Sequence, residues 1–169
     1  MLKLIISPNP VLTQSAIDWN FETDGNAAEL EQQMLAVMVN QQHAIGLAAN
    51  QVGILKRVFT IQLQNHPSIT EPFAMFNPAI ISVNENLILS QEGCISFPNL
   101  WLEVKRPESI VSEYFDKLGN KCIIELSGID ARCFLHELDH LNGICFTDKV
   151  SQLRLAMARK KQQKRKHNG

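Results

Sequence analysis

Apolar residues recur at helical spacing in three parts of the chain, the first from about Asn26 to Gln42. Asn26 is a typical helix N-cap, and Glu29 three residues later completes a capping-box pattern. The apolar positions that follow are three and four residues apart, which predicts one helical face turned to a core. They are Ala27, Leu30, Met34, Val37 and Met38.

The second helical pattern lies near the C-terminus and should begin with Asp130 as its N-cap. It should stop at Gly143, because glycine readily adopts the backbone conformation that ends a helix. Its apolar stripe consists of Phe134, Leu135, Leu138 and Leu141. A third helix is expected from Ser151 onward. The apolar face of this third helix would carry Leu153, Ala156 and Met157.

Between the first two helical patterns lie short runs of β-branched and aromatic residues separated by turn residues. They predict strands over 58–63, 73–76, 80–83, 87–89, 100–104, 109–115 and 121–126. Many short strands with helices at both ends indicate an α+β fold with mainly antiparallel sheets. Since no linker or repeat divides the chain, we expect one catalytic domain over 1–150 and a basic helical tail over 151–169.

The most specific chemical signal is the stretch Leu135-His136-Glu137-Leu138-Asp139-His140 in the second helix. Histidines four residues apart lie on one helical face, one turn apart, and can bind one metal ion. The glutamate between them is placed to act as a base rather than as a ligand. The alternative is a helix with two ordinary histidines, because this short pattern also arises by chance.

A catalytic site of this kind needs a third protein ligand and one open position. No glutamate follows His140, and Phe146 stands where a third histidine would complete the metzincin pattern. A cysteine, or an upstream acid or histidine, must therefore complete the site. Cys133 is too far along the helix axis for its short side chain to reach the metal. Cys94, which follows the flexible pair Glu92-Gly93, is the leading candidate.

Composition places limits on the class of protein. The chain has 169 residues, 45% hydrophobic and 20% charged, which is typical of one soluble globular domain. It shows neither a long apolar span nor a signal-peptide pattern, so a cytoplasmic protein without membrane association is expected. In that reducing compartment the four cysteines would not form a disulfide framework, and Cys122 and Cys145 are expected in the core.

Charge is uneven along the chain. The net charge is −1, yet the segment from Arg154 onward holds seven basic residues and no acidic one. Such a tail either remains a solvated basic helix or contacts a polyanion.

Three stretches together resemble, in order and spacing, the signature motifs of the peptide deformylases. They are Gly46-Leu47-Ala48-Ala49-Asn50-Gln51, Glu92-Gly93-Cys94-Ile95-Ser96 and His136-Glu137-Leu138-Asp139-His140. The resemblance extends from about Ser7 to Asp148. It implies an α+β fold with antiparallel sheets around a central metal-binding helix. It also implies removal of the formyl group from formyl-methionyl nascent polypeptides, with release of formate.

The resemblance implies roles for individual residues. Cys94, His136 and His140 would bind the metal, with water as fourth ligand, and Glu137 would take the proton of that water. Gln51 and the backbone N–H of Ile95 would stabilise the oxyanion. The substrate would lie along Ile45, Gly46, Gly93, Arg132 and Cys133. Glu92 and Arg106 match positions that the family uses for structural polar contacts.

The chain departs from the usual family pattern at four positions: Ala44 for a glycine, Ile95 for a leucine, Leu135 for a glutamine, and Arg132 for an apolar pocket residue. None of them removes a ligand or the base. Ala44 and Arg132 leave open a changed substrate preference.

The resemblance also implies a cofactor and partners. The metal would be Fe(II), although a thiolate and two imidazoles also suit zinc, nickel or cobalt. A monomer is expected, with the basic tail as a candidate ribosome contact. Two rival readings stay open: another small metallopeptidase, and a structural metal module that binds nucleic acid.

Overall fold

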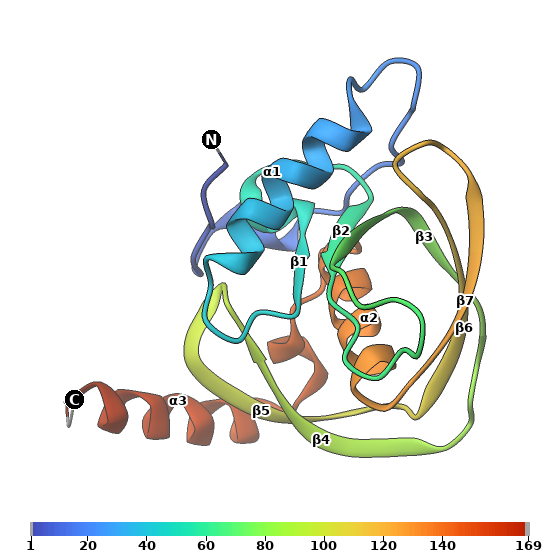
Figure 1. Cartoon of the computed structure of the whole chain (residues 1–169). Coiled ribbons are helices and arrows are strands. Elements are labelled where there is room, and N and C mark those ends of the chain that lie inside the picture. Colours follow the sequence, from blue (N-terminus) through green and yellow to red (C-terminus); the bar gives the residue numbers. More distant parts are fainter. Residues whose placement is uncertain (1, 168–169) are drawn as a thin grey trace.

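The computed structural model describes residues 2–167 and the side chains up to Lys164 (Figure 1). It has an α+β fold, as the pattern of short strands predicts. The helices are α1 (Ala27–Val39), α2 (Gly128–Leu141) and α3 (Gln152–His167). Three short 3-10 turns lie at Pro10–Thr13, Ala49–Val52 and Phe146–Lys149. No described helix is both long and apolar enough to cross a bilayer.

Within residues 2–167, seven strands form two antiparallel sheets. The larger sheet has the order β1-β2-β3-β6-β7, and β4 and β5 form a separate hairpin. The strands are β1 (Gly46–Ala48), β2 (Val58–Ile61), β3 (Phe73–Val83), β4 (Leu87–Cys94), β5 (Phe97–Pro107), β6 (Ser109–Phe115) and β7 (Lys121–Ser127). Figure 1 shows α2 enclosed between the sheets.

Helix α2 is the centre of the fold. From Asp130 to Leu141 every side chain is buried except that of Asp139. The predicted stripe packs on β2, β6 and β7, and the rings of Phe134 and Phe59 meet edge to face with centroids 5.2 Å apart. A helix surrounded in this way is held rigidly, because interior side chains are packed almost without voids.

The predicted N-cap of α2 is wrong. The helix begins at Gly128 after Ser127, so Asp130 lies in its first turn. The Asp130 carboxylate instead accepts the backbone N–H groups of Gln64 at 2.7 Å and Asn65 at 3.0 Å. An aspartate can satisfy amides of a distant loop as well as those of its own helix, and local sequence does not distinguish the two. The predicted stop is confirmed, since Gly143 follows the helix with φ +71°.

The boundaries of α1 and β3 also differ from those predicted. The Asn26 side chain accepts the N–H of Glu29 as predicted, but α1 ends at Val39 rather than near Gln42. The runs 73–76 and 80–83 belong to one strand, β3. Its pairing with β6 shifts between Phe76 and Ala79 and again between Ile80 and Ser82. The first shift contains Pro78, which has no N–H to donate.

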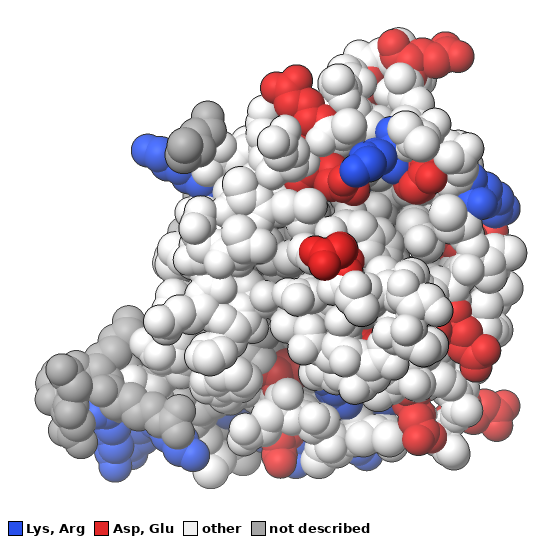
Figure 2. Space-filling model, in the orientation of Figure 1, with Lys and Arg blue, Asp and Glu red and all other residues white. Residues whose placement is uncertain are grey.

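The third helix packs through a face other than the predicted one. Leu155 and Ala158 of α3 pack against β5, whereas Leu153 and Met157 are 71% and 65% exposed. Five of the seven tail cations, Arg154, Arg159, Lys160, Lys161 and Lys164, are exposed. The side chains of Arg165 and Lys166 lie outside the described residues. Figure 2 shows Lys and Arg at the α3 end of the molecule.

Candidate metal centre

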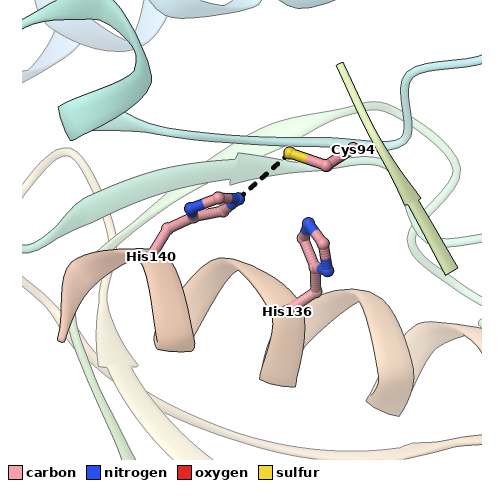
Figure 3. A group of neighbouring side chains, drawn as sticks. All are labelled: Cys94, His136 and His140. Atoms are coloured by element: carbon pink, nitrogen blue, oxygen red, sulfur yellow. Dashed lines mark hydrogen bonds between the residues drawn. The ribbon is translucent and has the colours of Figure 1, made fainter. Parts of the chain in front are cut away.

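Two side chains of α2 and one from the distant end of β4 converge at one place (Figure 3). Cys94, His136 and His140 each offer one ligand atom, and these atoms lie within 4.8 Å of one another. The two imidazoles project from successive turns of α2, and Cys94 comes from the end of β4. One sulfur and two imidazole nitrogens suit a divalent transition metal and leave a coordination position open. The donor set therefore fits a metal ion.

Contacts behind the three side chains fix their orientation. The Nδ1 of His136 lies 3.1 Å from Glu92 Oε2, which leaves Nε2 directed toward the site. The Nε2 of His140 lies 3.3 Å from Cys94 Sγ, and Asn50 Nδ2 donates to the carbonyl of His140 at 2.6 Å. A carboxylate behind a metal-binding imidazole fixes the ring and its tautomer.

Glu137 is buried next to this group and is only 4% exposed. Its Oε2 has no hydrogen-bond partner among the described residues. Burial raises the pKa of Glu137 to about 7, although the charge of His136 opposes the increase. A buried carboxyl group with an unpaired oxygen and a pKa near neutrality is able to exchange a proton with a bound molecule.

The pKa values of the other ionisable groups of the site are shifted in different directions. Burial disfavours the Glu92 carboxylate, but Arg106 and His136 outweigh this effect and hold the pKa of Glu92 well below its usual range. Burial lowers the pKa of His136, yet the thiol of Cys94 and the carboxylate of Glu92 raise it to about 10. Burial and the charge of His136 lower the pKa of His140. The two imidazoles are therefore not equivalent.

Gln51 is held with its amide nitrogen toward the site. Its Oε1 accepts the N–H of Ala48 at 2.8 Å, so its Nε2 points to Ser96 Oγ at 3.0 Å and to Cys94 Sγ at 3.5 Å. The N-terminal segment holds both Gln51 and the turn after Cys94, because Ile5 N donates to the carbonyl of Gln51 at 2.8 Å and Ser7 N donates to the carbonyl of Ser96 at 2.8 Å. Ile95 lies in the tight turn between β4 and β5.

A cavity of about 580 Å³ opens in front of these groups. All the residues predicted to contact substrate line it, as do Glu137 and two of the three predicted ligands, while His140 lies outside its lining. The predicted residues in the lining are Ile45, Gly46, Gln51, Gly93, Cys94, Ile95, Arg132, Cys133, His136 and Glu137. Cys133 is not part of the metal group; it is buried and lies 3.4 Å from the carbonyl of Ile45.

Two features of the cavity were missed by sequence reasoning. Trp101 lines the cavity, is 53% exposed, and would lie 3.0 Å from a Cβ placed on Gly93. Trp101 is an exposed position of β5, and nothing in the sequence pattern around it indicates that it borders a site. The guanidinium group of Arg132 is buried and faces Glu92, not the cavity rim. Of the two cysteines predicted for the core, Cys145 is buried and Cys122 is half-buried.

Comparison with known proteins agrees with this geometry. A model of the polypeptide deformylase family matches residues 1–156. The peptide deformylase of Rhizobium meliloti is 37% identical over 155 residues, 91% of this chain and 87% of that protein. The chain belongs to the polypeptide deformylase family. Members of this family are metal-dependent hydrolases that remove the formyl group from the N-terminus of nascent polypeptides, and the resemblance of the three motifs is confirmed.

Solved deformylase structures share the fold over nearly the whole chain. The crystal structure of a peptide deformylase from Legionella pneumophila has a TM-score of 0.85 at 31% identity and covers 99% of this chain and 96% of that one. The peptide deformylase of Synechococcus elongatus, solved in complex with actinonin, has a TM-score of 0.84 at 36% identity and covers 95% and 86%. The predicted fold class is confirmed.

Proposed function

We propose that Cys94, His136 and His140 hold the metal ion of this deformylase, and that Fe(II) is the native ion. The observation that carries the assignment is the convergence of their ligand atoms within 4.8 Å beside the unpaired oxygen of Glu137. A thiolate and two imidazoles also accommodate zinc, nickel or cobalt. When bound, the cation supplies Lewis-acid chemistry and lowers the pKa of water at the open position.

Glu137 acts as the general base and acid in this proposal. Its free Oε2 takes a proton from the attacking water and later passes it to the leaving amine. The Glu137 side chain is only 4% exposed and lines the cavity. The absence of a side chain at Gly46 leaves space for the Glu137 carboxyl group, because a Cβ at that position would lie 2.5 Å from Glu137 Oε1.

Two N–H groups would stabilise the negative charge that develops on the formyl oxygen. Gln51 Nε2 is held by the contacts of its carbonyl oxygen and needs no rotation to donate. The backbone N–H of Ile95, in the turn after Cys94, is the second donor. Loss of one such donor typically lowers the rate on the order of 10²–10³-fold.

The methionine side chain of the substrate would occupy the cavity between Ile45, Gly93, Cys133 and the stem of Arg132. The backbone of Gly46, at the start of the edge strand β1, would pair with the peptide. An edge strand offers unpaired backbone groups for this purpose. The salt bridge between Arg132 and Glu92 neutralises the guanidinium, which keeps this wall compatible with an apolar side chain.

The proposal is tested by measuring formate release from formyl-Met-Ala-Ser by protein purified anaerobically with iron. The Glu137→Gln variant serves as the matched control, because it retains the volume and removes the base. We expect release by the parent alone and equal iron content in both proteins. A Glu137→Gln variant as active as the parent would contradict the role of Glu137. A folded, metal-loaded parent without activity would contradict the proposed substrate.

We also propose that exposed cations of α3 contact ribosomal RNA and that the protein acts as a cytoplasmic monomer. The cytoplasm supplies nascent chains and keeps the Cys94 thiol reduced. The double variant Lys160→Glu/Lys161→Glu should weaken co-sedimentation with ribosomes and leave activity on the tripeptide intact. The control is Lys3→Glu/Lys105→Glu, which changes charge equally outside α3. Equal weakening of ribosome co-sedimentation by both variants would contradict a specific role of α3. The proposed monomeric state is tested separately by sedimentation equilibrium.

A further inference from the structure

Arg132 borders the cavity and also contacts Glu92, the carboxylate next to His136. Arg132 lines the cavity, yet the residue is only 7% exposed and its guanidinium group is engaged in buried contacts. Nη1 donates to Glu92 Oε1 at 2.7 Å and to the carbonyl of Val104 at 3.0 Å, and Nη2 donates to the carbonyl of Ile88 at 2.8 Å. The group is thus bound to both strands of the β4–β5 hairpin and to one carboxylate.

That carboxylate, Glu92, has four donors. Oε1 accepts from Arg106 Nε at 2.8 Å and from Arg132 Nη1, whereas Oε2 accepts from Arg106 Nη2 at 2.9 Å and lies 3.1 Å from His136 Nδ1. A carboxylate has about four lone-pair positions, so those of Glu92 are all used. Two arginines therefore hold the carboxylate in the plane from which Oε2 contacts the imidazole.

Charge balance supports the same conclusion. The buried carboxylate of Glu92 and the partly exposed carboxylate of Asp139 both pair with Arg106. One arginine cannot neutralise both carboxylates, and an unpaired charge on the buried Glu92 would be costly. Arg132 supplies the second buried positive charge. Lys149, at 3.1 Å from Asp139, is one-third exposed and contributes from the surface.

We propose that Arg132 is a positioning residue of the metal centre, which fixes the Glu92 carboxylate and through it the orientation of the His136 ring. This inference rests on the proposed role of His136 as a metal ligand. The apolar residue common at this position would line the cavity equally well but would leave one lone pair of Glu92 unused. The cavity wall and the metal centre are thereby connected through a single side chain.

The test uses cobalt as the bound metal, because its visible absorption bands respond to ligand geometry. The variant Arg132→Met keeps a long apolar stem and removes all donors, and Arg132→Lys keeps the charge but not the planar fork. The apparent dissociation constant for cobalt is measured by competition with a chelator. Partners behind a metal ligand are typically worth 10–100-fold in affinity, so we expect a rise of about that size for Arg132→Met.

We expect a smaller rise for Arg132→Lys, together with altered cobalt bands in both variants and a fall in kcat at nearly constant KM. Met34→Ala is the matched control, because it weakens the distant packing of α1 without touching Glu92. A purely structural role of Arg132 predicts that both Arg132 variants and the control differ from the parent only in stability. Unchanged affinity and bands in both Arg132 variants would overturn the inference.

A second control separates this inference from the proposed function. His136→Ala must lose cobalt affinity if His136 is a ligand. Parent-like affinity in His136→Ala would overturn the ligand assignment itself, and the Arg132 inference with it. If Arg132→Met does not fold, the affinity and spectrum of Arg132→Lys decide the question alone.

Discussion

Gly46 is the position where the smallest change should disturb the chemistry most. The structure places no positive φ there, so alanine fits the backbone, and the Gly46 N–H and carbonyl remain available to a peptide. An added Cβ, however, would lie 2.5 Å from Glu137 Oε1 and 2.8 Å from both Glu137 Cδ and Cys133 Sγ. The substitution Gly46→Ala therefore changes the position of the carboxylate without changing its chemistry.

The size of the effect follows from the contact distances. Ordinary contacts of a Cβ begin at 3.4 Å, so Glu137 Oε1 must move by about 1 Å. A displacement of about 1 Å in a catalytic group can cost about 10²-fold in rate. Overpacking of this kind also costs roughly 1–3 kcal/mol of stability. We expect kcat for formyl-Met-Ala-Ser to fall about 10²-fold while bound metal is retained.

The assay compares the parent, Gly46→Ala, Cys133→Ala and the double variant Gly46→Ala/Cys133→Ala. Removing the Cys133 thiol relieves one of the two clashes and leaves the clash with Glu137. We therefore expect the double variant to recover stability, measured by urea unfolding, but not kcat. Parent-like kcat in Gly46→Ala would refute the reasoning, since it would show that the Glu137 carboxylate need not stay where the structure places it.

Three further changes test the fold around the site. Burial, reinforced by Cys122, raises the pKa of Tyr114 to about 12, so the unfolded chain loses the phenol proton first. The free energy of unfolding should be unaffected below about pH 10 and should fall by up to about 2 kcal/mol as the pH rises to 12. In urea unfolding measured across this pH range, the Tyr114→Phe variant should not show this decrease. Phe134→Ala leaves a cavity against Phe59 and should destabilise by about 3–5 kcal/mol; a loss below 1 kcal/mol in calorimetry would contradict the packing of α2. Asp130→Ala leaves two backbone amides without their acceptor and should cost about 2–3 kcal/mol, whereas Asp130→Ser, which retains one acceptor, should cost less. Equal unfolding midpoints for these two variants would argue against the role of the amides.

Local sequence patterns predicted those features that depend on residues close to one another in the sequence. The Asn26 cap and the Gly143 stop were confirmed, because each depends on neighbours within a few residues. The strand 109–115 was also confirmed, and its buried side chains alternate along it. The pairing of His136 and His140 follows in the same way from the pitch of α2. The family itself was predictable from three short motifs.

Other features depend on which elements meet in space. Asp130 satisfies a loop some 65 residues away, and the exposed face of α3 follows from where β5 lies. The contacts of Arg132 were equally hidden, since its partners come from β4 and β5. No local pattern specifies which of several distant carbonyls or carboxylates a buried guanidinium group will reach.

By itself, the sequence determined that two imidazoles and a carboxylate share one helix, because helical periodicity is a property of the backbone. It also determined the antiparallel α+β class through the order and length of its elements. The tertiary structure alone showed that the Cys94 sulfur, already the leading candidate from the sequence, lies beside the two imidazoles, that Gly46 borders Glu137, and that Glu92 is held by two arginines. These depend on strand register and on the packing of the β4–β5 hairpin against α2, which arise only when the whole chain excludes water from a common core.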